Sequence, residues 1–150
     1  MASNLTQPNL EFDYGSRDLH HGWIKQQSNS LWSYGAFIEN GRLVDGTNGQ
    51  LKSMVRHLMD NYQILLFTTP NQDLLFTNIK EDDKRRFTAD MERFGYGFRN
   101  GREYSKLRLL SGACVGKDTC RLTYTDSERL EPQLIDELET KWGNLSESIG

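Results

Sequence analysis

Residues 64–79, ILLFTTPNQDLLFTNI, carry the strongest fold signal in the chain. Two mostly apolar runs, 64–68 and 74–79, flank the polar segment 69–73. Pro70 and Asn71 favour a turn there, because proline presets φ and asparagine tolerates the left-handed region. The stretch therefore predicts two strands joined by a loop.

One helix is expected on each side of this hairpin. The helix before it, residues 50–62, has apolar side chains at i, i+3, i+4, i+7 and i+8, which are Leu51, Met54, Val55, Leu58 and Met59. The helix after it, residues 81–94, opens with three acidic residues, which suit the positive end of a helix. Gly95 is expected to end that helix.

Further strands are expected upstream. Residues 23–25 predict a short strand, and residues 31–39 alternate in a strand pattern. Asn40-Gly41 follows and predicts a tight hairpin turn into residues 42–45, because a type I′ turn needs positive φ at both positions. The order hairpin, helix, hairpin, helix predicts an α+β fold: a ferredoxin-like sandwich, with an antiparallel sheet and two helices on one face, plus a C-terminal helical segment.

Composition and charge exclude several classes of protein. The chain has 150 residues, 36% hydrophobic and 26% charged, with a net charge of −3. Basic residues are scattered among acidic ones, so no nucleic-acid partner is expected. No run approaches the roughly 20 apolar residues of a membrane span, and the polar start lacks the apolar core of a secretion signal. We expect an intracellular protein with a flexible leader at residues 1–19.

Cys114 and Cys120 are the only cysteines, separated by five residues. Two thiolates this close could bind one metal centre, and Gly112 and Gly116 would let the backbone approach a bulky cofactor. The alternative is a pair of small buried thiols that fill space. Spacing alone leaves both interpretations open.

The segments around this loop are expected to be short. Residues 106–110 could form a final strand, and residues 120–129 a helix. A second helix should follow Pro132, with an apolar stripe of Leu134, Ile135, Leu138 and Trp142. Arg99, Arg102, Lys106 and Arg108 precede the loop; they could face an acidic cofactor or electron donor, but interspersed polar residues favour a solvated linker.

The chain resembles the siroheme-containing sulfite and nitrite reductases. Segments occur in the family's order at residues 22–25, 31–32, 37–42, 69–74, 113–120, 127–129 and 135–136. The resemblance extends over about residues 22–143. It implies a ferredoxin-like half domain at 20–98 and the start of the siroheme and 4Fe-4S domain at 99–150.

By this resemblance, Cys114 and Cys120 would be two ligands of a 4Fe-4S cluster. The family takes its other two ligands from a later C-x3-C pair, which this sequence lacks, as it lacks the earlier half that binds siroheme and substrate. The chain thus resembles a fragment that contributes scaffold and half of the cluster ligands, and that binds no complete cofactor alone.

The resemblance also implies a reaction and partners. The parent enzyme would reduce sulfite to sulfide or nitrite to ammonia by six electrons, in the cytoplasm or, in a plant-like source, a plastid. Its partners would be the remainder of the reductase polypeptide and a ferredoxin or flavoprotein electron donor. The rival hypothesis is a stand-alone ferredoxin-like binding or scaffold module without catalysis.

Two further groups of residues invite a functional interpretation. Asn71 and Gln72 could hydrogen-bond a tetrapyrrole carboxylate on the siroheme side, and a plain turn is the alternative. His20, His21 and His57 have no cysteine or carboxylate at ligand spacing, which favours surface histidines over a metal site.

Overall fold

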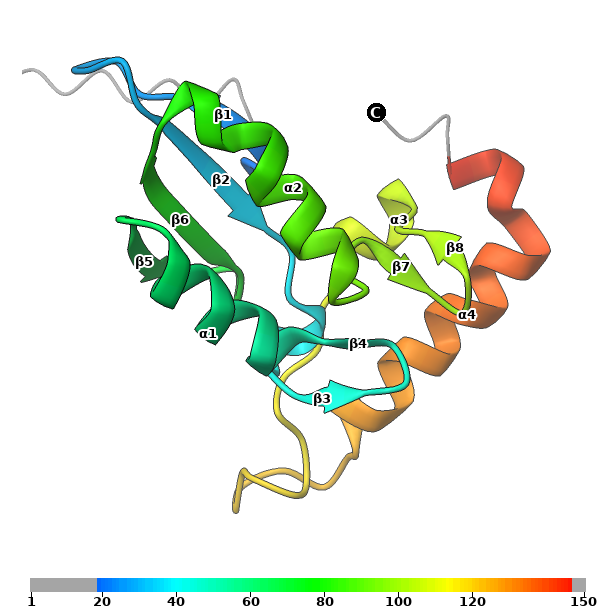
Figure 1. Ribbon diagram of the computed structural model, residues 1–150. Coiled ribbons are helices and arrows are strands. Elements are labelled where there is room, and N and C mark those ends of the chain that lie inside the picture. The colour runs from blue at the N-terminus through cyan, green and yellow to red at the C-terminus, as the bar shows by residue number, and fades with distance from the viewer. Residues whose placement is uncertain (1–18, 147–150) are drawn as a thin grey trace, which may run out of the picture.

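The computed structural model describes residues 19–146, so the expected leader at 1–19 lies almost wholly outside the described residues. Its centre is a four-stranded antiparallel sheet in the order β1-β2-β6-β5. The strands are β1 (Gly22–Lys25), β2 (Trp32–Ala36), β5 (Leu65–Thr68) and β6 (Leu74–Ile79). Helices α1 (Leu51–Asn61) and α2 (Lys84–Arg93) cover one face of this sheet (Figure 1). The expected ferredoxin-like α+β fold is confirmed.

The remaining elements are short, apart from one long helix. They are η1 (Glu39–Gly41), β3 (Asp45–Gly46), β4 (Gly49–Gln50), η2 (Glu81–Asp83), β7 (Phe98–Arg99), β8 (Arg102–Glu103), α3 (Lys106–Leu109) and α4 (Ser127–Ser146). α3, β7, β8 and α4 lie together at one end of the sandwich (Figure 1). Among the described residues, none of the helices has the length and apolar character to cross a membrane.

The core lies between the sheet and the two helices. Phe87 of α2 and Phe76 of β6 are fully buried, and their rings meet edge to face with centroids 5.5 Å apart. Tyr62, just after α1, packs on Phe87 in the same way at 5.2 Å. Edge-to-face contacts are favourable because the positive ring edge meets a negative ring face. Leu51, Met54 and Leu58 of the stripe predicted for α1 are buried in this core, whereas Met59 is exposed.

Gly95 ends α2 as expected. Its φ is +82°, its N–H donates to the carbonyl of Glu92, and the next N–H, of Tyr96, donates to the carbonyl of Met91. These two bonds form a Schellman motif, which satisfies carbonyls left free at a helix end.

The hairpin turn predicted at Asn40-Gly41 is wrong. Both residues do have positive φ, +52° and +69°, but they belong to η1, and residues 42–44 do not return along β2. β2 already pairs with β1 on one edge and with β6 on the other. No free edge of β2 remains for the chain after Gly41, and the first hairpin is β1–β2 instead.

Two elements near the cysteines also differ from expectation. Residues 106–109 form the helix α3 rather than a strand, and Ser105 caps it by accepting a hydrogen bond from the N–H of Arg108. α4 begins at Ser127, so residues 120–126 form turns rather than a helix. Pro132 lies inside α4 rather than at its first residue.

Candidate functional site: the cysteine loop and its supports

The cysteine loop, residues 110–126, joins α3 to α4 and projects from the lower end of the molecule (yellow in Figure 1). Within it, the N–H of Cys120 donates to the carbonyl of Gly116 at 2.9 Å. Gly116 is buried with φ +65°, and a Cβ there would lie 2.9 Å from the backbone nitrogen of Ser127. The loop can fold back onto the start of α4 because this position is glycine.

Cys114 is exposed, and its Sγ lies 3.3 Å from the hydroxyl of Ser127. The hydrogen bond from Ser127, helped by the N–H of Gly116, lowers the pKa of the Cys114 thiol. A lowered pKa favours the thiolate, which is the form that binds metal. Cys120 is partly buried, and both cysteines are free thiols. The alternative of two buried core thiols does not describe Cys114.

The donor set of the cysteine loop is incomplete by itself. Over residues 19–146, no group of three or more His, Cys, Asp or Glu side chains is placed to hold a metal ion. A 4Fe-4S cluster needs four thiolates, and the loop offers two. The residues present fit half of such a ligand set, and their role as ligands stays a prediction.

Asn71 and Gln72 are exposed on the loop between β5 and β6. The N–H of Gln72 donates to the carbonyl of Thr69, which closes the turn. Buried Asp73 anchors the loop by accepting a hydrogen bond from the N–H of Ile38 at 2.9 Å. The two amides are therefore free to contact a group from outside, and a siroheme-side role for them remains a prediction.

η1 connects that loop to the cysteine loop. A Cβ on Gly41 would lie 2.9 Å from the Cβ of Gln72, so the loop 69–73 packs directly on η1. The buried side chain of Asn40, also in η1, accepts a hydrogen bond from the N–H of Ala113 at 2.7 Å. The loop that carries Asn71 and Gln72 and the cysteine loop therefore both contact η1.

Arg108 joins α3 to η1 and to α4. It is 1% exposed and donates hydrogen bonds to Glu39 (2.6 Å), Asp136 (2.5 Å) and Glu139 (2.8 Å). Arg99 donates to Glu39 and Asp136 at 2.8 Å each. Burial raises the pKa of Asp136, but the hydrogen bond and charge of Arg99, with the charge of Arg108, hold that pKa below its ordinary value.

The prediction that the four basic residues lie in a solvated linker is therefore correct for two of them and wrong for the other two. Arg102 and Lys106 are exposed, as expected, whereas Arg99 and Arg108 are bound between acidic side chains. The sequence offered one usable signal, the spacing of Asp136 and Glu139, which places both carboxylates on one face of α4.

Two of the three histidines, His21 and His57, each lie beside a carboxylate. His21 Nε2 lies 2.9 Å from a carboxylate oxygen of Asp73, and His57 Nε2 lies 3.2 Å from Asp90. Both side chains are partly buried, at 18% and 24% exposure. Sequence reasoning missed these carboxylate partners because they lie far away in the chain.

Comparison with known proteins supports the family resemblance, although no family model matches the chain. The chain is 34% identical over 130 residues to a sulfite reductase [NADPH] hemoprotein beta-component of Staphylococcus haemolyticus, covering 87% of this chain and 22% of the relative. It is 35% identical over 134 residues to the corresponding protein of Methylocella silvestris, covering 89% and 23%.

The fold is also found in a solved structure. The Mycobacterium tuberculosis NirA protein superposes with a TM-score of 0.67 and 24% identity, over 87% of this chain and 22% of NirA. The chain spans roughly a fifth of the length of these relatives. By sequence, the chain belongs to the family of the sulfite reductase hemoprotein beta-components and corresponds to one segment of them.

Proposed function

We propose that this chain supplies scaffold and half of the 4Fe-4S ligands of a siroheme-dependent sulfite or nitrite reductase. The observation that carries the proposal is the cysteine loop, which holds an exposed thiol with a lowered pKa and a second thiol. Two thiolates match half of a cluster's needs.

The reaction of the parent enzyme would be the six-electron reduction of sulfite to sulfide or of nitrite to ammonia. Siroheme coupled to the cluster would supply the redox chemistry, as cofactors do in such enzymes. Cys114 and Cys120 would hold one side of the cluster, and Asn71 and Gln72 would hydrogen-bond siroheme carboxylates. A ferredoxin or flavoprotein would donate electrons, in the cytoplasm or a plastid.

The chain alone would be inactive and bind no complete cluster. The missing ligands and most of the siroheme contacts would come from the remainder of the reductase polypeptide. A cluster held by two thiolates would be labile, because its other irons would be open to solvent and exchange.

Co-expression with a complementary polypeptide carrying the earlier half and the C-x3-C pair would test this function. We expect the complex to contain about five irons, four in the cluster and one in siroheme, and Cys114→Ser or Cys120→Ser to lose the four cluster irons while the far-UV circular dichroism stays unchanged. Val115→Ser, an exposed change in the same loop, should keep the iron and serves as the control.

A scaffold module would behave differently in the same experiment. If both serine variants retained the iron of the unmodified complex, the cysteines would not be ligands, and the stand-alone binding module would be the better description.

A further inference from the structure

Asn40 has an unusual backbone and a buried side chain. Its φ and ψ are 52° and 24°, in the left-handed region, and the residue is 8% exposed. Asparagine and glycine adopt this conformation at little cost, whereas other residues are strained there. The backbone alone would permit glycine, so it does not explain why a buried amide occupies the position.

The amide of Asn40 binds two segments that lie far away in the chain. Its Oδ1 accepts from the N–H of Ala113 at 2.7 Å, and its Nδ2 donates to Oε2 of Glu131 at 2.9 Å. Nδ2 also lies 3.4 Å from the carbonyl oxygen of Glu128. One side chain therefore joins η1 to the cysteine loop and to α4.

The contact with Glu128 is explained by Pro132. In a regular helix the carbonyl of Glu128 would accept from the N–H four residues later, but proline has no N–H. Asn40 Nδ2 supplies the donor that Pro132 lacks. The other oxygen of Glu131, Oε1, is buried without a hydrogen-bond partner. Replacing the donor group of Asn40 by another acceptor would leave more buried oxygen atoms unpaired, which lowers stability.

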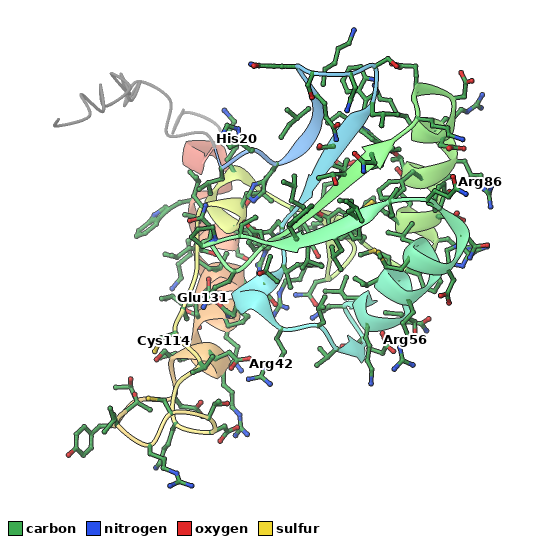
Figure 2. The ribbon with its side chains drawn as sticks, turned by 90° about the vertical axis from the view of Figure 1, so that its left-hand side faces the viewer. His20, Arg42, Arg56, Arg86, Cys114 and Glu131 are labelled. Atoms are coloured by element: carbon green, nitrogen blue, oxygen red, sulfur yellow. The ribbon has the colours of Figure 1, made fainter. Side chains whose placement is uncertain are left out.

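These bonds fix both ends of the segment around Cys114. Ala113 directly precedes Cys114, and Ser127, the first residue of α4, hydrogen-bonds its sulfur. Figure 2 shows Cys114, Glu131 and Arg42 on the same side of the molecule, away from Arg56 and Arg86 on the helical layer. Arg42 adds a second tie by pairing with Glu128.

We propose that Asn40 is a positioning residue for the cluster ligands: its amide holds the cysteine loop against α4 so that Cys114 and Cys120 present their sulfurs together. This inference rests on the proposed function of the two cysteines. Asn40 contacts neither sulfur and acts through Ala113, Glu128 and Glu131.

The test uses this chain and Cd²⁺ as a thiophilic probe, with thiolate-to-metal charge-transfer absorption as the readout. Asn40→Gly removes the amide and keeps a residue suited to positive φ. We expect it to weaken Cd²⁺ binding by about 10- to 100-fold, the usual effect of losing a group that orients ligands. Hydrogen exchange at the Ala113 amide should accelerate at the same time.

Asn100→Gly is the matched control. Asn100 also has a left-handed backbone, with φ +51°, but it is exposed and its amide hydrogen-bonds Asp136 instead of the cysteine loop. This variant should bind Cd²⁺ as the unmodified chain does. Hydrogen exchange of core amides in α1 and β6 should be unchanged in both variants.

A donor–acceptor swap provides a rescue. Asn40→Asp keeps the acceptor for Ala113 but places a second carboxylate against Glu131, so we expect weak Cd²⁺ binding. Adding Glu131→Gln restores a donor on the α4 side, because the glutamine amide can donate to the aspartate. The double variant should recover part of the lost affinity, because it restores the contact with residue 131 but not the donor to the carbonyl of Glu128.

The outcomes separate the two proposals. If the unmodified chain binds Cd²⁺ no better than the double variant Cys114→Ser/Cys120→Ser, the proposed function fails, and this inference fails with it. If the unmodified chain binds Cd²⁺ and Asn40→Gly binds it equally well, the role of Asn40 alone is overturned. A swap that recovers nothing also contradicts the hydrogen-bond pairing on which the inference depends.

Discussion

The ferredoxin-like sandwich and the segment after it are held by different forces. In the sandwich, buried apolar side chains fill the space between sheet and helices, with Phe76, Phe87, Met54 and Leu58 all at 0% exposure. Beyond residue 98, Ile135 is the one buried apolar side chain among the described residues, and buried Arg108 with its carboxylates takes the place of a core. Apolar burial is non-directional, whereas an ion-pair network fixes one arrangement and depends on every partner.

The largest expected effect comes from removing a central ring of the apolar core. Phe87→Ala deletes a ring that contacts Trp23, Tyr62 and Phe76, and should lower the free energy of unfolding by about 3–5 kcal/mol. Urea unfolding followed by far-UV circular dichroism would measure it. Phe98→Ala, at a side chain 40% exposed, is the control and should cost much less. Equal costs for the two variants would refute the assignment of the core.

Removing Arg108 should break the second region without unfolding the first. Arg108→Ala removes one cation from Glu39 and Asp136, which keep Arg99, and removes the cationic partner of Glu139. The cost should be about 2–4 kcal/mol, because these carboxylates are only 16–29% exposed. Hydrogen exchange should accelerate in α3 and α4 while α1 and β6 stay protected.

Arg102→Ala is the matched control for Arg108→Ala. Arg102 is exposed, and its removal should change exchange nowhere. If Arg108→Ala left α4 fully protected, or destabilised both regions equally, the two regions would not be held independently.

A smaller effect is expected at the glycines between the regions. Gly95 and Gly97 both have positive φ, but a Cβ at Gly95 would lie 3.1 Å from the Cα of Gly49, whereas at Gly97 nothing lies within 4 Å. Gly97→Ala should cost about 1–2 kcal/mol from backbone strain alone, and Gly95→Ala should cost more. The difference between the unfolding free energies of the two variants measures the close contact of Gly95 with Gly49. Equal unfolding free energies would contradict that contact.

The smallest effect should appear on acidification. The pKa of Asp136 is lowered in the folded chain, so its ion pairs stabilise α4 above the ordinary carboxylate range and weaken as pH falls below about 4. We expect α4 amides to lose exchange protection before the α1 amides in this range. Asp136→Asn should flatten the pH dependence of α4 protection. If that variant keeps the same pH profile, other titratable groups cause the pH dependence.

The sequence predicted the first region better than the second for a physical reason. Apolar periodicity reports burial directly, so α1, α2, β5 and β6 were placed correctly, as was the ending of α2 at Gly95. The Asn40-Gly41 turn was misassigned because local φ preference does not reveal which edges of β2 are already paired.

In the second region, the determining contacts join residues far apart in the chain. Arg108 and Glu39 are separated by 69 positions, and Asn40 and Ala113 by 73, and neither pair leaves a periodic signal. Cys114 and Cys120 could be proposed as a pair from the sequence because their spacing is local. The contact of Asn40 with their loop was missed because the Asn40-Gly41 pair had been assigned to a hairpin turn.

The most direct test of the half-site is the iron content of this chain alone after anaerobic reconstitution with iron and sulfide. The oligomeric state should be determined on the same sample by size-exclusion chromatography. We predict that the monomer retains fewer than four irons and lacks the broad visible absorption of an intact 4Fe-4S cluster. A monomer that kept four irons with that absorption would contradict the claim that Cys114 and Cys120 are half of a ligand set.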